Sequence, residues 1–185
     1  MRQTVVACGA LALHVRAIAA RRGWEIDVHP LPPDLHNRPE RIAPAVAEAA
    51  GRVERVAVAY GDCGTGGALD GYRRLAADTC YDVFARTDVR DALADEPGTY
   101  FLTDFLVRTF DRTILRSLGL DRYPELRDEY FRNYTRVVWL AQRPTARLHA
   151  AAERAAATLG LPLEVREVGD GGLQQALERL VEAPC

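Results

Sequence analysis

The chain has 185 residues, 48% of them apolar, and carries 24 basic and 26 acidic residues for a formal net charge of −2. This length suits one substantial hydrophobic core, so we expect a single domain over residues 1–185. The near-neutral charge gives no general attraction to nucleic acid or to an anionic membrane, and no stretch approaches the roughly 20 apolar residues of a membrane span. We therefore expect no nucleic-acid or membrane partner. The N-terminus lacks the pattern of a secretory leader, which predicts a cytoplasmic protein with reduced cysteines.

Strand and helix patterns alternate along the first third of the chain. Short β-rich or apolar runs predict strands at 4–7, 24–29 and 53–60, and helical spacing of apolar residues predicts helices at 11–22 and 38–50. This β-α-β-α-β order is typical of a doubly wound parallel sheet with right-handed connections.

The rest of the chain repeats this alternation with longer connections. The patterns predict a short helix at 71–77 and a strand at 79–84, followed by turn residues at 97–98, a strand to 103 and a helix at 105–117. The last elements are expected in the order helix, strand, helix, strand, helix, at 124–134, 136–140, 147–159, 163–168 and 173–181. The fold class predicted is α/β: a single three-layer doubly wound domain with a mostly parallel sheet.

Three cysteines lie where predicted strands meet loops. Cys8 and Cys63 each follow an apolar run, and Cys80 lies near the start of another expected strand, at 79–84. Open α/β sheets bind ligands at the carboxyl ends of their strands. Three thiolates gathered there would form a soft metal site with one open coordination position, which suits an iron–sulfur cluster or a catalytic zinc. We assign no role to Cys185.

Other interpretations of these cysteines stay open at this stage. A single buried cysteine often acts as a small apolar side chain, and the spacings here match no local C-x-x-C pattern. The sequence around Cys63 favours a functional cysteine over one that only fills the core. Glycines at 61, 64, 66 and 67 allow positive φ and close approach of a ligand.

The glycine-rich turn is a candidate cofactor-binding segment. Its run Gly64-Thr65-Gly66-Gly67 resembles an anion nest, in which backbone N–H groups converge on a negative group. A tight structural turn would need the same backbone freedom. We add Gly9, which directly follows the first strand, to this expected cofactor-binding set.

Two further residues are candidate catalytic groups. His36 lies in a proline-stiffened loop, where an imidazole could move protons near neutral pH. Asp104 lies at a strand-to-helix junction, where it would either cap the helix or share a crevice with the cysteines.

Five segments carry a resemblance to a known family: Leu35–Pro39, Tyr60–Gly67 (Tyr-Gly-Asp-Cys-Gly-Thr-Gly-Gly), Cys80-Tyr81, Pro97–Leu106 and Leu118–Arg122. With these segments, in this order, the chain resembles domain-of-unknown-function family 1638. The resemblance implies a cytoplasmic α/β protein with three recurring cysteines and no stated activity. Members commonly have histidine before the third cysteine, whereas this chain has Thr79, which shifts the expected ligand set to the three thiols alone.

We expect a metalloenzyme of lyase or transferase type with a 4Fe–4S cluster on Cys8, Cys63 and Cys80. Its fourth iron would be open to a small-molecule substrate or to S-adenosylmethionine, and His36 and Asp104 would orient substrate or move protons. One alternative places zinc on the same thiols for alkyl or methyl transfer. A second is a non-enzymatic carrier that passes a metallocofactor to a partner, and a redox sensor is a third.

Overall fold

A computed structural model describes residues 3–51 and 56–181, which divide into two compact units. The first unit comprises Met1–Val83 and Asp170–Cys185, and the second comprises Phe84–Gly169. The chain passes from the first to the second inside helix α3 (Cys80–Asp95), next to the non-helical Ala85, and returns between residues 169 and 170. Each unit has its own sheet, so we describe each by itself.

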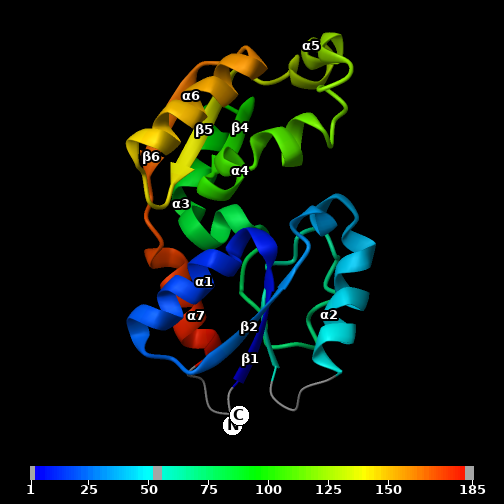
Figure 1. Ribbon diagram of the computed structural model, residues 1–185, viewed down its shortest axis with the longest axis vertical. Helices are drawn as coiled ribbons and strands as arrows, with labels where there is room; N and C mark the ends of the chain where they lie inside the picture. Colours follow the sequence, from blue (N-terminus) through cyan, green and yellow to red (C-terminus); the bar gives the residue numbers. More distant parts are fainter. Residues whose placement is uncertain (1–2, 52–55, 182–185) are drawn as a thin grey trace. The chain divides into compact units, whose positions relative to one another are not determined.

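The first unit is built on three parallel strands in the order β2-β1-β3 (Figure 1). These are β1 (Gln3–Cys8), β2 (Ile26–Leu31) and β3 (Val56–Ala59). The central strand is apolar on both faces, with Val5, Val6 and Ala7 fully buried, as expected of a covered parallel strand. Pro30 lies in β2, which the sheet tolerates because this strand is at an edge.

Helices cover both faces of this sheet. The chain steps from β1 to β2 on one side and then crosses to β3 on the other side, so right-handed connections place α1 (Gly9–Arg22) and α2 (Ile42–Ala50) on opposite faces (Figure 1). The closing helix α7 (Gly171–Val181) contacts α1 and β3. Two short turns of 3₁₀ helix, η1 (Pro33–Asn37) and η2 (Pro39–Arg41), join β2 to α2.

The last part of the segment between β3 and α3 pairs in parallel with β3 instead of forming a helix. Val58 donates its N–H to the Arg73 carbonyl and accepts from the Leu75 N–H, which makes a parallel bridge between Val58 and Arg74. The pairing continues past the strand, where Asp62 donates its N–H to Ala77 at 2.8 Å. The short helix expected at 71–77 is therefore wrong, because these backbone groups bond across to β3.

Helix α3 begins where a strand was expected. Thr79 and Asp82 form a reciprocal cap: the Asp82 carboxylate accepts from the Thr79 N–H at 2.8 Å, and the Asp82 N–H donates to the Thr79 hydroxyl at 3.3 Å. This capping box starts a helix at Cys80, so the strand expected at 79–84 is wrong.

The second unit is built on β4 (Thr99–Thr103), β5 (Arg136–Ala141) and β6 (Leu163–Glu167), parallel and in that order. Its core centres on the fully buried Trp139 of β5, against which α6 (Ala146–Leu159) packs an alanine-rich face. Between β4 and β5 lie α4 (Asp104–Arg108), a π-helical turn η3 (Asp111–Leu115), η4 (Pro124–Leu126) and α5 (Arg127–Phe131).

The α/β class and the parallel strands are confirmed, but the described strands form two sheets of three instead of one continuous sheet. Several boundaries also shift: the helix expected at 38–50 starts at Ile42, and the helix expected at 105–117 divides into α4 and η3. The first part of the strand expected at 53–60, residues 53–55, lies outside the described residues, as does Cys185. None of the helices in the described ranges combines the length and apolar character that a membrane crossing requires.

Candidate functional site: a three-thiol edge in the first unit

The candidate site lies at the carboxyl ends of β1 and β3, where the strand order reverses direction. Parallel register places Cys8 beside Leu31 of β2 and Ala7 beside Ala59 of β3, so the loops after all three strands leave the same edge. In doubly wound sheets the crevice at this reversal is the usual ligand site. The sequence-predicted Cys8 and Cys63 both belong to this edge.

Cys8 ends β1 and is the N-cap residue of α1. It is only 7% exposed. Burial raises the pKa of its thiol, and the neighbouring N–H groups of Ala10 and Leu11 oppose that rise without forming a cap hydrogen bond of ordinary geometry. A helix N-terminus favours a negative sulfur, so a thiolate here would be stabilised by α1 as well as by any cation bound to it.

Cys63 is held in an uncommon backbone conformation. Its φ of 50° lies in the left-handed region, which residues other than glycine rarely adopt. Its N–H donates to the Asp78 carbonyl at 2.7 Å, so the pairing beside β3 fixes this conformation. Strain of this kind persists where the surroundings impose it, and it clusters at functional sites.

Cys80 joins the same edge because the segment before it pairs with the residues after β3. It is the first residue of α3, two residues after Asp78, which accepts the N–H of Cys63. Burial, followed by the nearby Cys8 and Cys63 sulfurs, raises the pKa of the Cys80 thiol. Burial and then Cys8 raise the pKa of Cys63 to about 11. The three thiols are therefore close enough that the charge of one affects the pKa of another. All three are free cysteines.

Tyr60 is a residue of this edge that sequence reasoning missed. Its side chain is 1% exposed, and its hydroxyl lies beside the Cys8 sulfur without a well-formed hydrogen bond to any of the described residues. Burial, and then the adjacent Cys8 sulfur, raise the pKa of this hydroxyl. A buried hydroxyl without a well-formed hydrogen bond costs free energy unless something binds to it. The only available signal was a tyrosine at the end of a buried strand, directly before the glycine-rich turn.

The glycine-rich turn is organised by Asp62, a second residue that sequence reasoning missed. Its carboxylate accepts from the N–H groups of Gly67 at 2.8 Å and Gly66 at 3.2 Å and from the Thr65 hydroxyl at 2.9 Å. These bonds lower the pKa of Asp62. The expected anion nest is therefore filled by the chain's own carboxylate, which positions Cys63. It stays a prediction that this turn binds a cofactor through Gly64, Thr65, Gly66 and Gly67.

Gly9 and His36 lie in the loops beside Cys8. A Cβ on Gly9 would come within 2.7 Å of the Leu31 carbonyl oxygen and 3.0 Å of the Pro33 ring, so glycine lets the turn after β2 approach α1. The exposed His36 ring has its Nδ1 2.6 Å from the Pro33 carbonyl oxygen, which leaves Nε2 as the nitrogen that can exchange protons. The catalytic role of His36 and the cofactor role of Gly9 stay predictions.

Asp104 belongs to the second unit, whereas the cysteines belong to the first. It is fully buried, and its carboxylate accepts from Trp139 Nε1 at 3.0 Å and from the N–H groups of Gln142 at 3.1 Å and Arg143 at 2.9 Å. The cap of α4 is Thr103, not Asp104, because the Thr103 hydroxyl accepts from the Leu106 N–H. These bonds give Asp104 a structural task, and a catalytic one stays a prediction.

Within residues 3–51 and 56–181, no group of three or more histidine, cysteine, aspartate and glutamate side chains is arranged to hold a metal ion. The three thiols influence one another without forming a closed ligand set. The fold and the site thus define an α/β protein with three buried or half-buried thiols and a buried tyrosine at a strand-order reversal.

The comparisons with known proteins identify a family. Residues 30–177 match the family described as "Protein of unknown function (DUF1638)", so the chain belongs to that family. The match covers most of the chain, including Cys63 and Cys80. Neither a curated protein nor a solved structure matches the chain.

Proposed function

We propose that this protein is a metalloenzyme in which Cys8, Cys63 and Cys80 hold a 4Fe–4S cluster through three of its irons. The main support is that three thiols from three separate chain segments lie at one strand-order reversal, near enough to raise one another's pKa, beside the buried Tyr60 hydroxyl. The cluster, when bound, would supply a Lewis-acidic iron open to a small-molecule substrate or S-adenosylmethionine.

A cluster and a single zinc ion place different demands on the spacing of the three sulfurs. One zinc ion with Zn–S bonds of about 2.3 Å in a tetrahedral shell needs its sulfurs roughly 3.8 Å apart. A cluster binds each cysteine through a different iron, so its ligand sulfurs stand further apart. Metal and sulfide analysis decides between the two.

The chain's own groups have distinct tasks in this proposal. The N-terminus of α1 would stabilise the Cys8 thiolate, and Asp62 would hold the turn that presents Cys63. The Tyr60 hydroxyl would donate to a sulfur or to the bound substrate. His36 would exchange protons through Nε2, since its Nδ1 is engaged by Pro33.

The test is iron and sulfide analysis of protein produced anaerobically with ample iron. Brown protein is expected, and Cys8→Ser, Cys63→Ser and Cys80→Ser should each lose most of the colour, because two thiolates are too few anchors. Cys185→Ser is the matched control and should keep its colour. His36→Ala should keep its metal as well.

Other outcomes would replace the proposal with one of its rivals. Colourless protein with one tightly bound zinc, lost in the same three variants, would establish the zinc–thiolate alternative. A cluster that moves readily to an acceptor protein, with no turnover of any substrate, would establish a carrier. Colour loss in Cys185→Ser would show that the ligand set is wrong.

A further inference from the structure

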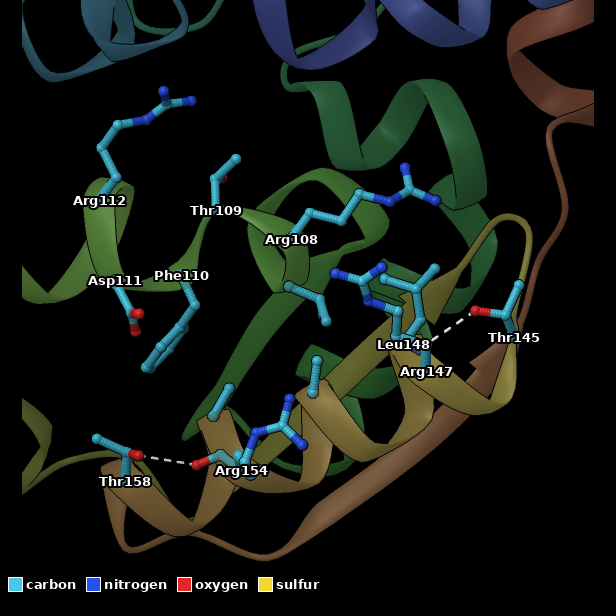
Figure 2. Close-up of a pocket in the computed structure, with 13 residues that line it drawn as sticks. Arg108, Thr109, Phe110, Asp111, Arg112, Thr145, Arg147, Leu148, Arg154 and Thr158 are labelled. Atoms are coloured by element: carbon cyan, nitrogen blue, oxygen red, sulfur yellow. Dashed lines mark hydrogen bonds between the residues drawn. The ribbon is translucent and has the colours of Figure 1, made fainter.

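A second candidate site lies wholly within the second unit, between the segment after β4 and helix α6. Its cavity measures about 850 Å³. One wall is residues 107–112, which run from the end of α4 to the start of η3, and the other is α6 with its cap Thr145 (Figure 2). Helix η3 is a π-helical turn, a rare structure found frequently at functional sites.

The charge of this cavity is strongly positive, although the protein as a whole has a net charge of −2. Arg108, Arg112, Arg147 and Arg154 line it, and Asp111 is the one acidic residue among the lining residues. Figure 2 shows Arg147 and Arg154 reaching from α6 toward the opposite wall.

These arginines have few partners inside the protein. Arg108 has one distant contact, 3.9 Å from Asp104. Across the described residues, the side chains of Arg112, Arg147 and Arg154 form no ion pair or hydrogen bond with any other side chain. By contrast, Arg136 of the same unit bonds both Glu96 and Glu164, and Arg166 bonds Glu164. Positive charge without internal partners favours an external anion.

The remaining lining residues suit an organic molecule instead of a bare ion. Phe110 and Leu148 are buried apolar side chains at the cavity, and Thr109 also lines it. The volume falls in the range of small-molecule sites, which are mostly apolar with a few polar groups that fix orientation. Arg147 and Arg154 are seven residues apart, or about 10 Å along the axis of α6. A ligand that reaches both carries more than one anionic group.

We propose that this cavity binds a small organic phosphate with at least two anionic groups, of about the size of a nucleotide. Guanidinium groups match phosphate oxygens with paired, charge-assisted hydrogen bonds, so Arg147 and Arg154 hold the phosphates. Phe110 and Leu148 cover the apolar part of the ligand. This site is independent of the three-thiol edge, because its residues belong to the other unit.

The test is calorimetric titration of the full chain, in the presence of EDTA, with ATP, pyrophosphate and citrate as probes. ATP should bind most tightly, since it adds apolar contact to phosphate contact, and citrate should bind most weakly. Arg147→Gln/Arg154→Gln should weaken ATP binding about 100-fold, at roughly tenfold for each charged hydrogen-bonding group lost. Arg116→Gln/Arg143→Gln is the control: it removes the same charge from exposed positions that do not line the cavity, and should change affinity less than about threefold.

Several results would overturn the proposal. One is that neither ATP nor pyrophosphate binds at millimolar concentration. Another is that the two double variants lose the same amount of ATP affinity, and a third is that citrate binds as tightly as pyrophosphate. Tighter binding of a single-stranded oligonucleotide than of ATP, lost in Arg147→Gln/Arg154→Gln, would replace the small molecule with a nucleic acid. Circular dichroism of each variant separates loss of binding from loss of fold.

Discussion

Asp104 illustrates how a buried charge can serve structure alone. Its carboxylate is fully buried and accepts from Trp139 Nε1 and from two backbone N–H groups after β5. We predict that Asp104→Asn lowers the free energy of unfolding of the second unit by about 2–4 kcal/mol, because the one remaining oxygen serves only one side of the site and the amide NH₂ would face at least one N–H donor that then lacks an acceptor. Urea unfolding followed by Trp139 fluorescence in a Trp24→Phe background measures this.

The control for this prediction is Asp121→Asn, an exposed aspartate of the same unit, which should change stability by less than about 0.5 kcal/mol. If Asp104→Asn is as stable as the wild type, the three donors are not the reason for a carboxylate at this position. The predicted catalytic role would then regain support.

At the residue scale, the sequence indicated which cysteines to examine but not what surrounds them. Cys8 and Cys63 could be chosen because each follows an apolar run, and strand ends are visible in sequence. The buried hydroxyl of Tyr60 beside Cys8 could not be predicted, since its hydrogen bonding depends on which groups reach it in three dimensions. The role of Asp62 was within reach, because an aspartate followed by Thr65 and two glycines is a known turn pattern.

Among the elements, the junction of β1 and α1 depends on Gly9. A Cβ there would contact the Leu31 carbonyl oxygen and the Pro33 ring. We predict that Gly9→Ala lowers the free energy of unfolding of the first unit by about 1–3 kcal/mol through overpacking, and reduces the iron content of anaerobically prepared protein. Unfolding followed by Trp24 fluorescence measures the first effect.

Gly71→Ala is the matched control for Gly9→Ala. No atom lies within 4 Å of a Cβ at position 71, and its φ is not positive, so alanine should be neutral or stabilising by up to about 1 kcal/mol. Equal effects of the two substitutions would mean that close packing at Gly9 is not what matters.

Elements with strong local patterns could be predicted, and those set by distant pairing could not. The strands around Val5 and Val138 and the helix α6 follow apolar periodicity and appear where expected. Residues 73–77 have no such pattern and are not helical, because Val58 of β3 and Asp62 after it bond to their backbone. The error at 79–84 was avoidable, since Thr79-Cys80-Tyr81-Asp82 has the spacing of a capping box.

For the molecule as a whole, strand pairing was the least predictable property. Alternation of strands and helices is the same in both halves of the chain, so it gives the α/β class but not the number of sheets. Pairing depends on contacts between distant residues, such as Thr4 with Val56 in one sheet and Thr99 with Arg136 in the other. Separate sheets also separate the two candidate sites, which therefore allow separate tests.

This separation gives a prediction about the cluster that uses the whole molecule. A ligand that binds only the folded state stabilises it by RT ln(1 + [L]/Kd), which is about 2.7 kcal/mol at 100 times Kd. Cluster loading should therefore slow amide hydrogen exchange in β1 and β3, whose ends carry Cys8 and lead to Cys63, and leave β4 and β5 unchanged. Mass spectrometry of anaerobic samples, with and without cluster, measures this for both units in one experiment.

Cys63→Ser treated in the same way is the control and should show no change in β1 or β3. Equal slowing in all four strands would mean that the units unfold together, and no slowing in β1 and β3 would refute cluster binding at the three-thiol edge.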